Sequence, residues 1–90
     1  MDYELNLDDV FEFKGDDYIV IDKIKYEEED YYFVNKLLNE EEPGKEFYVM
    51  KGLKEGLIVE KNEEILNKVY PIFSSNINKK LEYFNQNDGE

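Results

Sequence analysis

The apolar residues of the first sixty positions come in short runs, and glycine-containing or acidic segments separate the runs. Alternation of apolar and polar positions, with many tyrosine, phenylalanine, isoleucine and valine residues, is typical of β-strands. The pattern predicts strands near residues 10–13, 18–26, 31–34, 46–50 and 57–60. Connections this short join antiparallel neighbours, because parallel strands need long crossovers. We therefore expect a meander of four or five antiparallel strands.

A different period begins at Asn62. The next apolar residues recur mostly every three or four positions, which predicts one helix over residues 62–84; they are Ile65, Val69, Ile72, Phe73, Ile77, Leu81 and Phe84. Asn62 suits the N-cap position, because its side chain can accept hydrogen bonds from the first turn. Pro71 has no amide hydrogen, so we expect either a kink there or a break into helices at 62–70 and 71–84.

These elements predict a single α+β domain over residues 1–90. The expected architecture is an antiparallel meander with one kinked C-terminal helix packed on one face. Residues 1–8 and 85–90 are predicted to be tails. Residues 18–21 are apolar on both faces, and Leu66 and Tyr70 lie beside the helix stripe. A homodimer that covers these positions is therefore one alternative for the assembly.

Net charge is the most informative feature of the composition. The chain carries a formal charge of −12. Residues 1–46 hold sixteen carboxylates against five lysines, whereas residues 47–90 hold seven against six. A field of this sign repels nucleic acid and anionic membranes and attracts basic partners. We therefore expect a basic protein partner, and neither direct nucleic-acid binding nor a membrane partner.

Missing residue types exclude several kinds of chemistry. The sequence has no cysteine and no histidine, and all eleven basic residues are lysine. Disulfides, thiolate metal sites and the commonest general base are therefore excluded. Ser74 and Ser75 have no histidine to activate them, and no glycine-rich phosphate loop or calcium-loop motif occurs. We expect no enzyme activity, no catalytic residue, no cofactor and no metal.

The predicted compartment is the cytoplasm. No apolar run approaches the roughly 18 residues that a membrane span needs, and the first residues are acidic, unlike those of a signal peptide.

The candidate binding residues are carboxylates clustered in the predicted turns. The predicted contacts for a basic partner are Asp16, Asp17, Glu27, Glu28, Glu29, Asp30, Glu40, Glu41 and Glu42. Other interpretations stay open. The clusters can be ordinary solvated turns, or rows of carboxylates can imitate DNA phosphates and inhibit a nucleic-acid-binding enzyme. Phage inhibitors of CRISPR nucleases are similar to this chain in size and acidity only. The predicted function is thus a small non-enzymatic protein-binding module, with mimicry or a structural dimer as alternatives.

The first half of the chain also carries a family resemblance. The relevant positions are Phe11, Phe13, Gly15, Tyr26 and the segments 18–22 and 31–34. Their order of strand, glycine turn, apolar strand, acidic turn and tyrosine-rich strand resembles small acidic proteins of unknown function from low-GC Gram-positive bacteria and their phages. The resemblance implies a succession of hairpins and carries no activity with it. The near-neutral helix with Pro71 departs from the acid-rich ending of that family.

Overall fold

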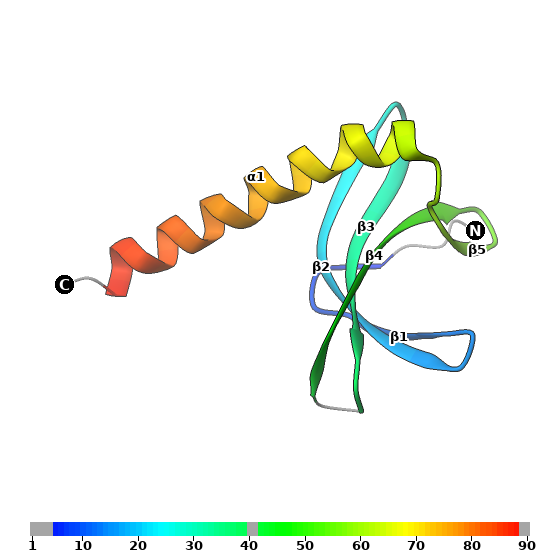
Figure 1. Cartoon of the computed structure of the whole chain (residues 1–90), viewed down its shortest axis with the longest axis horizontal. Helices are drawn as coiled ribbons and strands as arrows, with labels where there is room; N and C mark the ends of the chain where they lie inside the picture. Colours follow the sequence, from blue (N-terminus) through cyan, green and yellow to red (C-terminus); the bar gives the residue numbers. More distant parts are fainter. Residues whose placement is uncertain (1–4, 40–41, 89–90) are drawn as a thin grey trace.

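The computed structural model describes residues 5–39 and 42–88, with side chains described as far as Lys79. It contains one curled sheet and one long helix (Figure 1). The elements are β1 (Val10–Phe13), β2 (Asp16–Tyr26), β3 (Glu29–Leu37), β4 (Pro43–Leu53), β5 (Gly56–Val59) and α1 (Glu63–Asp88). The five strands form one antiparallel sheet in the order β1-β2-β3-β4-β5. The predicted α+β meander with a C-terminal helix is therefore confirmed, with five strands.

Two turns are tighter than predicted. Lys14 and Gly15 alone join β1 to β2, and Glu27 and Glu28 alone join β2 to β3. All four residues have positive φ, and the two glutamates have φ of 51° and 70°. Two-residue hairpin turns of this kind favour asparagine and glycine, because other side chains are strained in this conformation. The acidic β2–β3 turn is therefore held in a backbone conformation that glutamate does not favour.

The inner face of the curled sheet encloses one part of the core. Tyr32, Val20, Val34 and Met50 are fully buried there, and the first and last strands add partly buried residues around them. Leu5 also packs into this cluster, and its backbone N–H donates to the Tyr32 hydroxyl at 3.2 Å. Leu5, which lies in the predicted tail of residues 1–8, therefore contributes to the core.

The outer face of the sheet is covered by the first half of α1. Val69 and Phe73 from the helix are buried against Tyr31 and Val49 from the central strands. Leu66, which the sequence left beside the stripe, packs into this cluster too. Ile72 was predicted on the buried stripe, but its side chain is 37% exposed. That prediction was wrong, because the stripe that faces the sheet is narrower than the apolar stripe in the sequence.

A β-bulge allows β2 to serve both faces. The pairing of β2 with β3 shifts register between Val20 and Asp22. Before the shift, Tyr18 and Val20 point to the inner face; after it, Ile24 and Tyr26 point to the helix side. A strict alternation would have kept all four on one face, so the extra residue redirects the second half of the strand.

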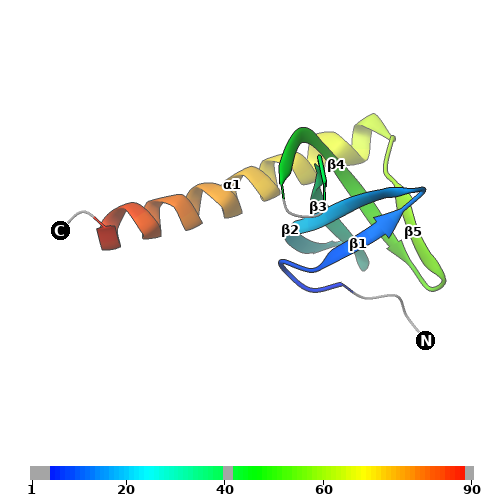
Figure 2. The ribbon, with the colours of Figure 1, turned by 90° about the horizontal axis from the view of Figure 1, so that it is seen from below.

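Helix α1 is continuous through Pro71 and ends at Asp88, four residues beyond the predicted end. The predicted break is therefore absent. Pro71 and Asn67 both lie on the exposed side, where water can satisfy the carbonyl group that Pro71 leaves without a donor. The predicted N-cap is confirmed, since Asn62 Oδ1 accepts from the N–H groups of Glu64 at 2.8 Å and Ile65 at 3.3 Å. Figures 1 and 2 both show the second half of α1 running beyond the sheet.

Candidate functional site

The predicted contact residues lie at two opposite ends of β2. Glu27, Glu28, Glu29 and Asp30 lie at the β2–β3 turn, whereas Asp16 and Asp17 begin β2 at its other end. Glu42 belongs to the β3–β4 connection, which an antiparallel meander also places opposite the β2–β3 turn. Glu40 and Glu41 lie outside the described residues. The structure therefore divides the predicted set into two groups and does not align it in one row (Figure 1).

Two carboxylates at the Asp16 end of β2, Asp16 and Glu42, are engaged within the fold. Asp16 Oδ2 lies 3.6 Å from Lys36 Nζ. Glu42 exchanges two hydrogen bonds with Asn39: its N–H donates to Asn39 Oδ1 at 3.1 Å, and its Oε1 accepts from Asn39 Nδ2 at 3.0 Å. These interactions fix local structure and offset part of the negative charge. This end is therefore the weaker candidate for binding a basic partner.

The other end contains a groove that the sequence did not predict. It lies between the β2–β3 turn and the first two turns of α1 and has a volume of about 410 Å³. Its lining residues are Tyr26, Glu27, Glu64, Ile65, Asn67 and Lys68. The two apolar side chains come from β2 and α1, and each is followed or preceded by a glutamate. A groove with an apolar lining and carboxylates at its rim thus forms where the helix begins.

More carboxylates gather around Tyr31, next to this groove. Burial raises the pKa of the Tyr31 hydroxyl first, and the negative charges of Glu60, Glu29 and Glu27 raise it further. These glutamates come from the β5–α1 connection, β3 and the β2–β3 turn, so the fold brings them together from three places in the sequence. We call this surface the acidic end and define it as Glu27, Glu28, Glu29, Glu60 and Glu64.

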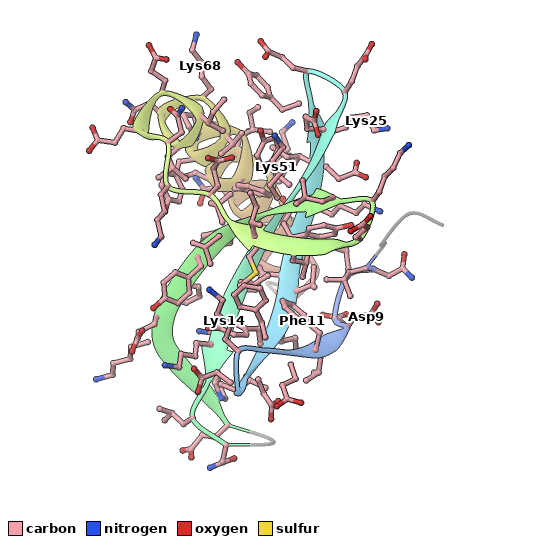
Figure 3. The ribbon with its side chains drawn as sticks, turned by 90° about the vertical axis from the view of Figure 1, so that its right-hand side faces the viewer. Asp9, Phe11, Lys14, Lys25, Lys51 and Lys68 are labelled. Carbon is pink, nitrogen blue, oxygen red and sulfur yellow. The ribbon has the colours of Figure 1, made fainter. Side chains whose placement is uncertain are left out.

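Lysines border the acidic end without filling it. Lys51 Nζ lies 4.0 Å from Glu29 Oε1, at the limit of an ion pair. Figure 3 shows Lys68, Lys51 and Lys25 in the upper part of the molecule, while Lys14 and Phe11 lie lower in the view. Lys68 also lines the groove. The positive charge of Lys68 opposes the binding of a basic side chain in the groove.

The chemistry of the groove suits a long basic side chain. The methylene groups of lysine or arginine can lie along Tyr26 and Ile65, and the charged end can then reach Glu27 or Glu64. An aromatic face adds attraction for a cation. Among the described residues, no group of three or more Asp or Glu side chains is placed to hold a metal ion.

Sequence reasoning found one of the six lining residues of this groove. Glu27 was among the candidate contacts, and Ile65 was placed on the helix stripe without a binding role, whereas Tyr26 and Glu64 were not candidates. Tyr26 and Ile65 are distant in the sequence, and no local pattern connects them. They meet because β5 returns the chain to the end of the sheet where β2 turns into β3, and α1 starts there.

A second hollow lies on the inner face between the two edge strands. It has a volume of about 610 Å³ and includes Phe13, Tyr18 and Tyr48 in its lining, together with Lys14, Lys36 and Lys61. Its polar groups satisfy one another in part: the Tyr48 hydroxyl donates to Glu46 Oε1 at 2.6 Å, and Lys14 Nζ lies 5.5 Å from the centre of the Phe13 ring. Three of the eleven lysines therefore line this hollow, Lys14, Lys36 and Lys61.

Comparison with known proteins gave no match to a family model, to a curated protein or to a solved structure. The resemblance to small acidic bacterial and phage proteins therefore stays a prediction. Among the residues that the structure describes, no helix is long and apolar enough to cross a membrane.

Proposed function

We propose that this protein is a non-enzymatic binding module that captures a lysine- or arginine-rich segment of a partner protein at its acidic end. The observation that carries the proposal is the groove between the β2–β3 turn and α1. There Tyr26 and Ile65 supply an apolar lining, and Glu27 and Glu64 supply charge from two separate elements. The proposed compartment is the cytoplasm, as predicted from the sequence.

The backbone of the β2–β3 turn supports the same proposal. Glu27 and Glu28 both have positive φ, which disfavours glutamate by about 1–2 kcal/mol per residue relative to its usual conformations. Asparagine and glycine would fit this turn better. A strained residue that persists beside a groove is consistent with a role in binding.

The mimicry alternative receives less support from the geometry. A mimic of DNA needs carboxylates arranged in a continuous row, whereas the predicted clusters occupy opposite ends of β2, and those at the Asp16 end are partly paired. The net charge of −12 still contributes to binding, because it speeds the approach of a basic partner.

The test measures binding of a fluorescein-labelled arginine octapeptide by fluorescence anisotropy. Wild-type protein should bind, and binding should weaken as salt rises, because exposed charge pairs are screened. The double variant E27Q/E64Q removes both rim charges. Two exposed pairs contribute about 0.7–1.4 kcal/mol together, so affinity should fall about three- to tenfold. The variant K68Q should bind more tightly.

The matched control is the double variant E12Q/D17N. It changes the net charge by the same amount, and Glu12 and Asp17 face each other across β1 and β2, far from the groove. Its affinity should remain close to that of the wild type. If both double variants weaken binding equally, only overall charge attracts the peptide, and the proposed groove is wrong. A glutamate octapeptide should not bind.

A further inference from the structure

The hollow between the two edge strands, which we call the inner hollow, has a volume of about 610 Å³. The strand order leaves β1 and β5 as the two edges of the sheet. Both edges line the hollow, because Phe13 belongs to β1, and Leu57 and Val59 belong to β5. A molecule that enters the inner hollow therefore contacts both edge strands at once. The volume lies within the range of about 300–1,000 Å³ that is typical of small-molecule sites.

Aromatic and aliphatic side chains supply the apolar surface of the inner hollow. Tyr18 meets Phe13 and Tyr48 in edge-to-face geometry, with ring centres 6.3 and 6.0 Å apart. Tyr18 is buried, whereas Phe13 and Tyr48 are only partly buried, as are Leu57 and Val59. The lining thus leaves part of its aromatic surface open. A further aromatic ring is attracted to such a surface, because offset and edge-to-face ring pairs are favourable beyond the area that they bury.

The charge of the inner hollow is opposite to that of the whole chain. Its charged lining residues are Lys14, Lys36, Lys61 and a single carboxylate, Asp16, whereas the chain has 23 carboxylates and 11 lysines. Asp16 lies 3.6 Å from Lys36 and offsets its charge. Lys14 and Lys61 are both exposed. Glu46 lies nearby, where it accepts the hydrogen bond of a lining tyrosine, and even with it the lysines are in excess.

We propose that the inner hollow binds a small aromatic molecule that carries a phosphate group. The ring packs against Phe13, Tyr48 and Leu57, and the phosphate lies at the rim, where Lys14 and Lys61 attract it. A phosphate monoester carries a charge of about −1.5 to −2 at neutral pH. Two lysines therefore match a phosphate better than they match a carboxylate of single charge. Charge complementarity thus selects the ligand.

The negative charge of the rest of the chain limits the size of this ligand. The net charge of −12 repels a long polyanion such as nucleic acid. Salt screens charges beyond about 8 Å at physiological ionic strength, so the nearest lysines dominate for a single phosphate group. The inner hollow therefore suits a small molecule and not nucleic acid. It shares no lining residue with the groove at the acidic end, so the proposal does not depend on binding of a basic partner.

A titration of the ¹⁵N-labelled full chain with 1-naphthyl phosphate tests the site by NMR. The amide signals of Phe13, Leu57 and Val59 should shift together and saturate with a Kd of about 1 mM or lower. 1-Naphthol has the ring without the charge, and inorganic phosphate has the charge without the ring. Each should bind at least about tenfold more weakly. No shifts at these three residues, or equal binding of either comparison compound, would overturn the proposal.

Removal of two lysine charges tests the phosphate contact. K14Q/K61Q should weaken the binding of 1-naphthyl phosphate about three- to tenfold, because both exposed side chains line the inner hollow. The matched control K25Q/K68Q removes the same charge from exposed lysines outside the lining, and Figure 3 shows both of them above Lys14. Its affinity should stay close to that of the wild type. Equal losses in the two double variants would mean that only net charge matters and would refute the site.

Two further variants test the ring contact and separate this site from the acidic end. F13L replaces a lining ring with an aliphatic side chain and should reduce the preference for 1-naphthyl phosphate over inorganic phosphate. An unchanged preference would contradict the ring contact. E27Q/E64Q, which should weaken binding of the arginine octapeptide, should not weaken binding of 1-naphthyl phosphate. A loss in E27Q/E64Q would place the ligand in the groove at the acidic end and contradict the proposal.

Discussion

The two halves of α1 belong to one helix and differ in what surrounds them. Residues 63–77 lie on the outer face of the sheet, where Val69 and Phe73 are buried against β3 and β4. Residues 78–88 have the same period in the sequence but extend beyond the sheet. An amphipathic pattern specifies which face of a helix is apolar. The length and position of the sheet then determine which part of that face is buried within the chain.

Truncation of one apolar residue in each half of α1 should give the largest difference in stability between the halves. Phe73 is 1% exposed, so F73A should reduce the free energy of unfolding by about 3–5 kcal/mol. L81A should change it by less than about 0.5 kcal/mol, because the second half of α1 extends beyond the sheet. Urea denaturation followed by circular dichroism measures both. A loss for L81A as large as that for F73A would mean that the second half also packs on its own sheet.

A polar contact anchors the end of the docked half. Asn76 Nδ2 donates to Asp22 Oδ2 at 2.9 Å, and Asp22 is only 5% exposed. N76A leaves this buried carboxylate without its donor and should cost about 1–3 kcal/mol. S75A, at an exposed neighbouring position, should stay within about 0.5 kcal/mol of the wild type. Urea denaturation measures both variants. Similar losses of stability for N76A and S75A would mean that the hydrogen bond to Asp22 does not stabilise the packing of α1 on the sheet.

The N-cap stabilises the start of the docked half. Asn62 Oδ1 accepts two hydrogen bonds from the first turn. N62A should therefore lower stability by about 1 kcal/mol, whereas N62G should lower it by only a few tenths, because glycine is tolerated at this position. Thermal unfolding of both variants measures the difference. If alanine and glycine cost the same, the side-chain cap contributes nothing beyond the backbone.

The smallest expected effect is on the dependence of stability on high pH. Burial and then Glu60 raise the pKa of Tyr31, which lies under the docked half, above its ordinary value of 10.0. The folded state therefore favours the neutral phenol. The contribution is fully present below about pH 10 and is lost as pH rises through the folded pKa.

Burial, followed by the charge of Asp16, raises the pKa of Tyr18 in the same direction. Denaturation curves from neutral pH to above pH 10 should show stability falling at the alkaline end, and Y31F should reduce the slope. The exposed tyrosine variant Y70F is the control. An alkaline slope that is unchanged in Y31F would show that other groups cause it.

The sequence by itself determined the elements of this fold. Strand alternation and short turns predicted the antiparallel meander, the first strand was predicted at its observed bounds, and Asn62 marked the start of the helix. The missing histidine and cysteine and the charge of −12 were also plain in the sequence. These features are local or additive, so neighbouring residues and simple counts suffice to predict them.

Only the tertiary structure decided which faces of the strands and of the helix pack against each other. The bulge at Val20–Asp22 turns β2 from one side of the sheet to the other, and no residue in that run signals it. The groove of Tyr26, Glu27, Glu64 and Ile65 exists because the turn of one hairpin meets the start of α1. The sheet is also shorter than the helix, which leaves residues 78–88 beyond it. Such features depend on contacts between residues that are distant in the sequence, and the local periodicity of apolar residues does not predict these contacts.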